Sequence, residues 1–200
     1  MEPFEKEIRA KGFKLVAGLD EAGRGPLAGP VVAAAVVLPP RVRLPGVDDS
    51  KKLSARQREE VFSLLQKRVS AIGVGIVEAE EIDRLNIHRA SLKAMEKAVA
   101  ALPCPPDYLL IDGRFTLNLP LAQKAVVKGD QKCLSVAAAS IVAKVTRDRI
   151  MIACHQEYPE YNFARHKGYG TKEHLRAIEK YGRCPLHRLT FRRDNQPVLL

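Results

Sequence analysis

The chain has 200 residues, with 33 Lys or Arg against 23 Asp or Glu, so its formal net charge at pH 7 is +10. Hydrophobic residues make up 46% of it, which is enough to build a buried core and excludes intrinsic disorder as the main state. No apolar run approaches the roughly 20 residues of a transmembrane helix, and the polar, acidic N-terminus does not resemble a signal peptide, so we expect a cytoplasmic protein.

The first part of the chain predicts two strands, a helix and a third strand. Apolar residues alternate and then become continuous over Phe13–Leu19, which is typical of a strand, and a polar, Gly-rich turn follows. Pro30–Leu38 predicts a second strand, paired with the first as a hairpin. Ser54 fits the N-cap of a helix over Ala55–Val69. The Val-, Ile- and Gly-rich segment Ser70–Val77 predicts another strand.

The second part alternates helices and strands. Helices are expected over Ala79–Leu85 and Ile87–Leu102, and strands over Asp107–Ile111 and Gln123–Val127. The strongest helical pattern covers Lys132–Cys154, with an apolar stripe from which the charged side chains are excluded.

A short helix over Lys172–Tyr181 and a basic tail complete the chain. A hairpin followed by alternating strands and helices predicts a mixed α/β sheet with helices on its faces. On the long helix, Lys144, Arg147 and Arg149 are expected to lie off the apolar stripe.

Carboxylates stand where the predicted strands end. Asp20 and Glu21 follow the first strand, Asp112 the fourth and Asp130 the fifth. Strand ends are where sheet proteins present functional side chains, so these acids can converge on one point. Clustered carboxylates repel one another unless cations share them, and hard oxygen ligands suit Mg²⁺ or Mn²⁺. Two such ions about 3.5–4 Å apart can activate a water and stabilise the leaving oxygen in phosphoryl displacement.

Each acid also has a structural explanation. Asp20 and Asp112 fit turn positions, Glu21 fits a solvated neighbour, and Asp130 fits a helix N-cap. The joint pattern on a basic chain favours a metal-dependent enzyme that acts on phosphates, since Lys and Arg release counterions when they neutralise phosphates. Charge alone also fits a ribosome-associated protein or a membrane-surface protein.

Two other ligand-binding patterns are disfavoured. Gly23–Ala28 fits the spacing of the dinucleotide-binding loop, but that loop requires a helix to begin at once, and here Pro30 and a Val- and Ala-rich strand follow. The four cysteines are far apart and form no CxxC pair, so we expect free, buried thiols and neither zinc nor disulfides.

Several segments together resemble the ribonuclease HII family, the type 2 ribonucleases H. Asp20–Val31 is similar to the opening signature of that family. The resemblance continues, in family order from residue 13 to about residue 191, through Asp49–Ser54, Ile111–Gly113, Lys128–Asp130, Ser135–Asp148, His166–His174, His187-Arg188 and Phe191.

The resemblance implies a ribonuclease H-like fold, in which a mixed five-stranded sheet is flanked by helices and followed by a C-terminal helical segment. Residues 1–155 would form the catalytic core. Residues 156–200 would pack on that core and contribute substrate contacts. The catalytic complex would hold two Mg²⁺ or Mn²⁺ ions. The metal-binding, catalytic acids implied by the resemblance are Asp20, Glu21, Asp112 and Asp130.

The resemblance also implies which residues contact the nucleic acid. The loop formed by Gly23, Arg24 and Gly25 would meet the RNA–DNA junction, because residues without a side chain let the backbone approach a ribose 2′-OH. Tyr169 is similar to the family tyrosine that packs on the sugar beside the junction. The residues expected to bind backbone phosphates are Ser50, Lys51, Lys52 and Lys144.

Some of these residues have alternative interpretations. Tyr169 also fits a half-buried core aromatic, and the basic residues also fit a solvated face. His166, His174 and His187 fit surface or core positions better than metal ligation, because the carboxylates already supply the ligands.

The implied activity is hydrolysis of RNA in RNA–DNA hybrids. It includes cleavage 5′ of a single ribonucleotide embedded in duplex DNA, leaving 5′-phosphate and 3′-hydroxyl ends. A monomer is expected, with no membrane partner. One alternative is a ribonuclease HIII-like enzyme, a family that usually has an N-terminal substrate-binding domain and an acid pair led by Glu. Another is a nucleic-acid-binding protein of the same fold with an inactive site.

Overall fold

A mixed five-stranded sheet, in the order β3-β2-β1-β4-β5, organises the chain. The computed structural model describes residues 3–47 and 53–191. The strands are β1 (Val16–Ala22), β2 (Val31–Val37), β3 (Ala71–Val77), β4 (Tyr108–Asp112) and β5 (Ala122–Val126). The helices are α1 (Pro3–Ala10), α2 (Ala55–Arg68), α3 (Ala79–Leu85), α4 (Ile87–Ala100), α5 (Leu134–Glu157), α6 (Phe163–His166) and α7 (Lys172–Tyr181), with 3₁₀ turns η2 (Gly129–Gln131) and η3 (Pro159–Tyr161).

The sheet is antiparallel on one side of β1 and parallel on the other. The strands β1, β2 and β3 form an antiparallel meander, whereas β1, β4 and β5 run parallel. The predicted hairpin and the predicted mixed sheet with flanking helices are therefore confirmed. Because the parallel strands end at the same edge, residues at their C-terminal ends lie close together.

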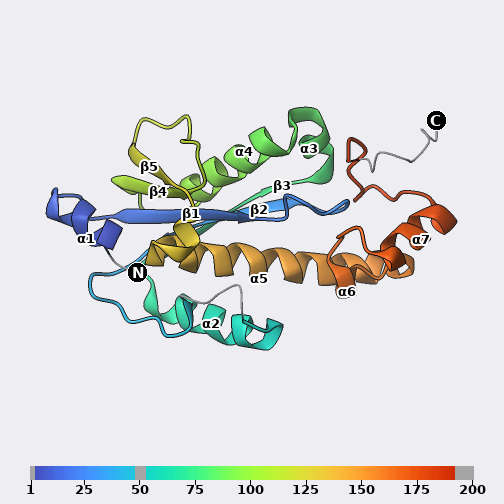
Figure 1. Cartoon of the computed structure of the whole chain (residues 1–200), viewed down its shortest axis with the longest axis horizontal. Coiled ribbons are helices and arrows are strands. Elements are labelled where there is room, and N and C mark those ends of the chain that lie inside the picture. Colours follow the sequence, from blue (N-terminus) through green and yellow to red (C-terminus); the bar gives the residue numbers. More distant parts are fainter. Residues whose placement is uncertain (1–2, 48–52, 192–200) are drawn as a thin grey trace.

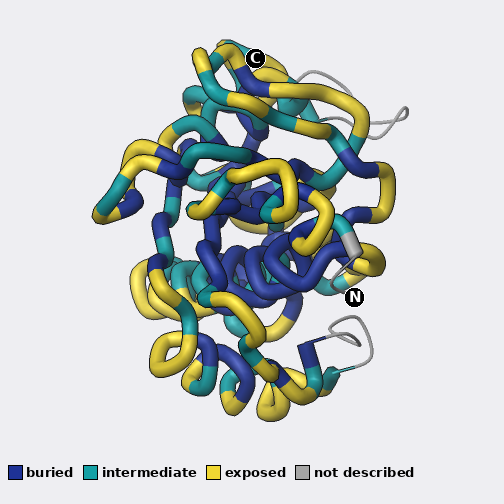
Figure 2. The backbone as a smooth tube through the Cα atoms, turned by 90° about the vertical axis from the view of Figure 1, so that its left-hand side faces the viewer, coloured by how far each residue is buried: buried dark blue, intermediate teal, exposed yellow. Residues whose placement is uncertain are grey.

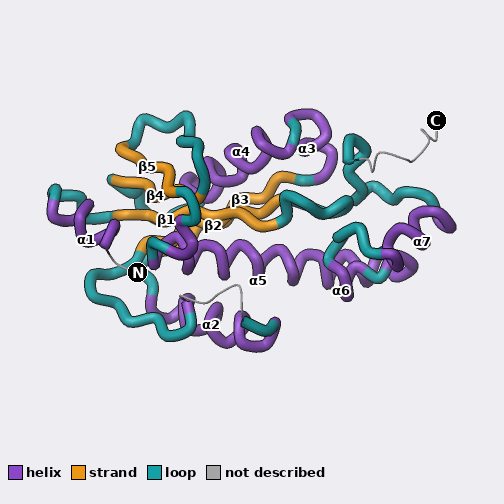
Figure 3. The backbone as a smooth tube through the Cα atoms, viewed as in Figure 1, coloured by secondary structure: helices purple, strands orange, loops and turns teal. Residues whose placement is uncertain are grey.

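Helices cover both faces of the sheet. Figures 1 and 3 show α4 over one face and α5 over the other, with α2 on the outer side of α5. The helices α6 and α7 lie beyond one end of the sheet (Figure 1). Figure 2 shows that the buried backbone is concentrated in the middle of the molecule. No helix in the described ranges is long and apolar enough to cross a membrane.

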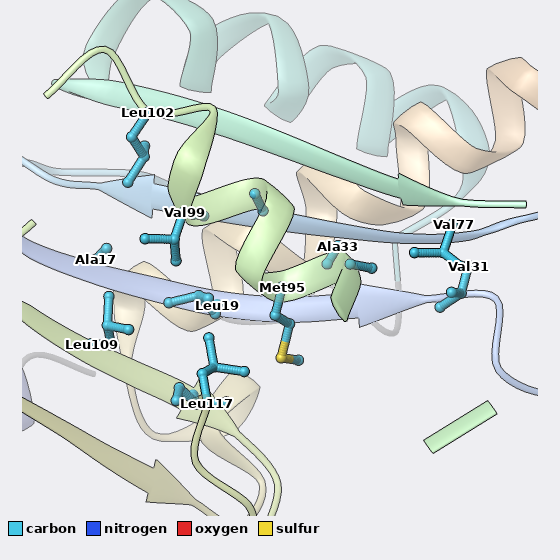
Figure 4. Packing of buried hydrophobic residues seen from close by; sticks show 14 of the residues in the cluster. Ala17, Leu19, Val31, Ala33, Val77, Met95, Val99, Leu102, Leu109 and Leu117 are labelled. Atoms are coloured by element: carbon cyan, nitrogen blue, oxygen red, sulfur yellow. The ribbon is translucent and has the colours of Figure 1, made fainter. Parts of the chain in front are cut away.

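The face under α4 forms an apolar core. Figure 4 shows Met95 and Val99 of α4 beside Leu19 of β1. At the edge strand β3, a Cβ on Gly73 or Gly75 would overlap the backbone of α4. The glycines in β3 therefore allow the helix to approach the sheet closely.

The face under α5 depends on an equally close approach. A Cβ at Gly18, in the middle of β1, would overlap the backbone of Ser135 and Val136. The long helix therefore lies directly on the central strand, at a distance that any larger side chain would prevent. The predicted apolar stripe of this helix is buried as expected: Leu134, Ala137, Ala138, Ile141, Val142 and Val145.

One expectation for α5 is wrong. Arg147, which the pattern assigned to the solvent side with Lys144 and Arg149, is only 1% exposed. Its guanidinium donates hydrogen bonds to the carbonyls of Ala28 and Pro30, more than a hundred residues earlier in the chain. Long-range partners of this kind leave no trace in the local sequence pattern.

The positions of the acids relative to the strands also differ from the expectation. β1 continues through Asp20 and Glu21, because its pairing with β2 extends to Ala22. β4 likewise includes Asp112 as its last residue. These three acids are therefore held by strand backbone rather than by a following turn.

The N-terminal helix α1, which the sequence analysis did not predict, caps α5. The N-cap residue Cys133 provides no side-chain cap. Instead, Oε1 of Glu5 accepts hydrogen bonds from the amide and the hydroxyl of Ser135, each at 2.8 Å. An eight-residue helix is marginal alone, so its stability depends on such tertiary contacts and on burial of Ile8.

Replacing Glu5 by Gln removes the negative charge from the N-terminus of α5 while keeping the side-chain size. We expect the free energy of unfolding to fall by about 1–2 kcal/mol, since charged hydrogen bonds at a helix N-terminus are stabilising. Urea denaturation measures this. The matched control is Glu7→Gln on the exposed side of α1, which should change stability by less than about 0.5 kcal/mol. Equal effects of the two substitutions would contradict the capping role.

Candidate active site

Asp20 and Asp112 occupy equivalent positions on adjacent parallel strands. Leu19 of β1 aligns with Ile111 of β4, and the acid is the next residue on each strand. Gly18 packs against α5, and side chains two residues apart on a strand share a face, so Asp20 faces α5 as well. Its carboxylate accepts a hydrogen bond from the Ser140 side chain on that helix.

The carboxylates of Asp20, Glu21 and Asp112 lie close enough to repel one another. Asp20 is only 7% exposed, and burial raises the pKa of its carboxyl well above the usual range. The charges of Glu21 and Asp112 raise that pKa further. Burial also raises the pKa of Glu21, although its ion pair with Arg24, at 3.0 Å, opposes the shift.

Asp130 is placed near the same edge of the sheet by the contact that its neighbour Gly129 makes with Asp112. The amide of Gly129 donates a hydrogen bond of 2.7 Å to Oδ1 of Asp112. A Cβ at Gly129 would lie 3.2 Å from Val136 and 3.3 Å from Oδ1 of Asp112, so a larger residue would crowd this contact. Asp130 follows directly in η2, buried at 6% exposure, at the start of α5.

The chemistry of these donors fits a divalent cation. As the side chains stand, no group of three or more Asp, Glu, His or Cys residues in the described ranges is arranged to hold a metal ion. Asp20, Glu21 and Asp112 are nevertheless close enough for the last two to raise the pKa of the first. Hard oxygen ligands with mutual repulsion match the preferences of Mg²⁺ and Mn²⁺.

The loop after β1 carries the predicted Gly-Arg-Gly segment. Gly23 has a φ of +100°, a conformation that favours glycine. A Cβ on Gly25 would lie 3.9 Å from the ring of Tyr169, which is 43% exposed. Tyr169 is therefore a surface aromatic beside the loop and not a core residue.

Lys144 lies close to this loop. Its Nζ is 6.0 Å from the centre of the Tyr169 ring and 2.7 Å from Oδ1 of Asp148. The structure thus brings together Gly25, Tyr169 and Lys144 from three distant parts of the chain. Three further residues predicted to bind phosphate lie outside the described residues: Ser50, Lys51 and Lys52.

His166, His174 and His187 form a buried group below Tyr169, which confirms the core interpretation of these residues. Nε2 of His166 is 2.7 Å from the carbonyl oxygen of Tyr161. A carbonyl only accepts, so this nitrogen carries the proton. Nδ1 then accepts from the amide of Gly168 at 3.2 Å.

The same reasoning fixes the other two tautomers. Nδ1 of His174 donates to the carbonyl of Tyr169 at 3.0 Å, so its Nε2 accepts from Nε2 of His187, also at 3.0 Å. Nδ1 of His187 accepts from the amide of Cys184 at 2.9 Å. Burial lowers the pKa of His174 and of His187 to about 4. All three rings are therefore neutral at pH 7, and the hydrogen bond from His174 holds the carbonyl of Tyr169.

The cysteines are free thiols, as expected. Only one of them, Cys133, is fully buried, whereas the others are partly exposed. The expectation of buried thiols is therefore correct for Cys133 alone, because the other three lie near the ends of helices or in turns.

Sequence reasoning missed two buried arginines, Arg147 and Arg188. Arg188 hydrogen-bonds the carbonyls of Gly23, Arg24 and Gly29. The one available signal was the His-Arg pair in the last segment of the family resemblance, and nothing in it indicated burial.

Comparison with known proteins gives consistent matches. The family model for ribonuclease HII matches residues 17–194. A ribonuclease HII of Geobacter metallireducens is 59% identical over 189 residues, covering 94% of this chain and 89% of that protein. One of Syntrophobacter fumaroxidans is 60% identical over 188 residues, covering 94% and 81%. The crystal structure of ribonuclease H2 from Pyrococcus horikoshii OT3 has a TM-score of 0.76 at 32% identity, covering 88% of this chain and 93% of that one.

The histidine tautomers are directly testable by ¹⁵N NMR. We expect the proton on Nδ1 of His174 and on Nε2 of His166 and His187, because each nitrogen faces an acceptor. His174 and His187 should stay neutral when the pH is lowered through 6.5, the ordinary pKa of histidine, since burial lowers their pKa values to about 4, and burial also lowers the pKa of His166.

The lowered pKa values of the histidines also make the stability of the fold depend on pH. The unfolded chain binds protons at these histidines near pH 6.5, whereas His174 and His187 in the folded protein bind them only near pH 4. Their contribution to the free energy of unfolding therefore falls as the pH decreases between these values. Titration of any of the three rings near pH 6.5 in the folded protein would contradict the proposed network.

Proposed function

This chain belongs to the ribonuclease HII family, whose members are metal-dependent endoribonucleases that degrade RNA in RNA–DNA hybrids, and on that basis we propose its specific reaction. We propose that it also cuts duplex DNA on the 5′ side of a single embedded ribonucleotide, leaving 5′-phosphate and 3′-hydroxyl ends. The observation that carries the proposal is the group of carboxylates at the ends of β1 and β4, beside a Gly-rich loop that exposes Arg24 and Gly25, on a basic protein.

We assign the catalytic role to the strand-end acids. Asp20, Glu21, Asp112 and Asp130 would hold two Mg²⁺ or Mn²⁺ ions. When bound, such ions supply an activated water and stabilise the departing 3′ oxygen. The hydrogen bonds from Ser140 to Asp20 and from Gly129 to Asp112 orient these carboxylates in advance, which lowers the entropy cost of assembling the site.

The carboxylate of Glu21 is paired with an arginine in the structure, and it would have to leave this partner to bind a metal ion. Its ion pair with Arg24, 3.0 Å long, holds the carboxylate toward the loop. If Glu21 holds a cation at the strand end, its carboxylate would have to leave Arg24. Release of Arg24 would leave its guanidinium available to a phosphate of the substrate.

We place substrate recognition at the loop and at Tyr169. Backbone groups of Gly23, Arg24 and Gly25 would contact the 2′-OH, the group that distinguishes RNA from DNA. The ring of Tyr169 lies 3.9 Å from the position that a Cβ on Gly25 would occupy. This exposed ring would pack against the adjoining sugar. Lys144, with Ser50, Lys51 and Lys52, would bind backbone phosphates.

We further propose that residues 1–155 form the catalytic core and residues 156–200 a segment that completes the substrate face. The contacts between the two parts support this. The amide of Leu27 donates to the carbonyl of Gly168, and the amide of Gly29 donates to that of Leu186, both at 2.8 Å. A monomer in the cytoplasm remains the expected state of the enzyme.

Substituting Asp20 by Asn tests the assignment of the acids. We expect kcat to fall on the order of 10²–10³-fold, because a charged group at the reaction centre is lost. Stability should be retained or increased, since the substitution removes a buried charge whose pKa is raised by its neighbours. Cleavage assays and thermal denaturation measure these effects.

Asp130→Asn should likewise lower kcat on the order of 10²–10³-fold while RNA–DNA hybrid binding persists. The matched control is Glu59→Gln, which removes an exposed carboxylate that pairs with Arg149 on the outer surface. Full activity of either aspartate variant would remove the mechanism. A wild-type protein that binds hybrids without turnover would instead favour the inactive, nucleic-acid-binding alternative.

The basic charge predicts a strong dependence of binding on salt. Each phosphate contact releases counterions, so affinity for a hybrid duplex should fall by at least about tenfold between roughly 50 and 200 mM salt. Fluorescence anisotropy with the Asp20→Asn variant measures binding without cleavage. Equal affinity at both concentrations would show that the basic surface does not bind the nucleic acid.

A further inference from the structure

Behind the Gly-Arg-Gly loop lie two buried arginines, Arg147 and Arg188. Each is 1% exposed. Neither forms an ion pair with a carboxylate in the described part of the chain, and both donate to backbone carbonyls instead. Burial and the charge of Arg147 lower the pKa of Arg188 to about 9. Burying two like charges side by side is costly, and such costs are expected at functional sites.

The guanidinium of Arg188 gathers the carbonyls of the loop. Nη2 donates to Gly23 at 2.6 Å and to Gly29 at 2.8 Å, Nη1 donates to Arg24 at 3.1 Å, and Nε donates to Gly29 at 3.0 Å. The planar fork of donors can satisfy several carbonyls at once, which a lysine cannot do. Both ends of the loop are thus fixed to one side chain.

Arg147 supports the same loop from α5. Its Nε donates to the carbonyl of Pro30 at 2.9 Å, and its Nη2 donates to that of Ala28 at 3.1 Å. A Cβ at Gly23 would overlap the Arg147 side chain. The first glycine of the loop is therefore required by contact with this arginine as well as by its positive φ.

The loop carbonyls accept hydrogen bonds from the buried arginines, whereas two of the loop amides have no such partner among the residues that the structure describes. Within the described residues, the amides of Arg24 and Gly25 donate to no backbone or side-chain acceptor. Arg147 also lies under Tyr169, with its guanidinium carbon 5.9 Å from the ring centre. One pair of buried cations therefore contacts both parts of the proposed recognition surface.

We propose that Arg188 is a positioning residue that sets the conformation of the Gly23–Gly29 loop for recognition of a ribonucleotide, with Arg147 as its second support. This inference rests on the proposed function. Arg188 lies after the last helix, so the end of the described chain completes a site whose acids lie on β1 and β4. The loop, once fixed, presents free N–H groups to the substrate.

The test compares two substrates in one assay: duplex DNA with a single ribonucleotide and a long RNA–DNA hybrid. For Arg188→Lys we expect the ratio of their kcat/KM values to fall at least about tenfold against the single ribonucleotide, because that substrate depends on one precise 2′-OH contact. Arg188→Met should lower the ratio further. Arg149→Lys, a substitution of an exposed arginine on α5, should leave it unchanged.

The outcomes separate the two proposals. If Arg188→Lys loses activity equally on both substrates, or keeps the wild-type ratio, the positioning role is wrong while the proposed function stands. A wild type that cuts neither substrate overturns the proposed function, and the positioning role with it. Should neither Arg188 variant fold, Arg147→Lys tests the same support from α5, with the same selective loss expected.

Discussion

The close packing of α5 on β1 at Gly18 is the constraint on which the rest of the structure depends. Because no side chain separates the helix from the strand there, the side chain of Ser140 reaches Asp20. In the turn before the helix, the amide of Gly129 donates a hydrogen bond to Asp112. Farther along, the same helix carries Arg147 to the loop after β1. A single helix therefore positions both the proposed chemistry and the proposed recognition, and shifting it would disturb both together.

Charge is separated within the molecule in an ordered way. The carboxylates crowded at the strand ends repel one another, and a divalent cation would relieve that repulsion. Behind the loop, the buried arginines donate to backbone carbonyls, and these hydrogen bonds offset part of the cost of burial, although Nη1 of Arg147 has no partner among the described residues. Below Tyr169, three histidines are neutral, so they fix the backbone without adding charge. The other Lys and Arg side chains can bind a polyanion where they are exposed at the surface.

Local sequence patterns predicted the helices and strands whose formation depends mainly on neighbouring residues. The expected helices over Ala79–Leu85 and Lys172–Tyr181 match α3 and α7, and Thr171 caps α7 by accepting from the amide of His174. The N-cap Ser54 is also confirmed, within a capping box. The acids were found because they stand at strand ends, although their convergence on a metal remains a prediction. Arg147 and the Glu5 cap were missed, since each depends on partners more than a hundred residues away.

The central claim is that the strand-end acids form a metal-dependent site that acts next to a ribonucleotide. The most direct measurement is cleavage of duplex DNA containing one ribonucleotide by the unmodified protein, with Mg²⁺, with Mn²⁺ and with EDTA. We predict a single cut 5′ to the ribonucleotide that requires a metal and leaves a 3′-hydroxyl end. Cleavage that persists in EDTA, or tight binding without a cut in either metal, would contradict it.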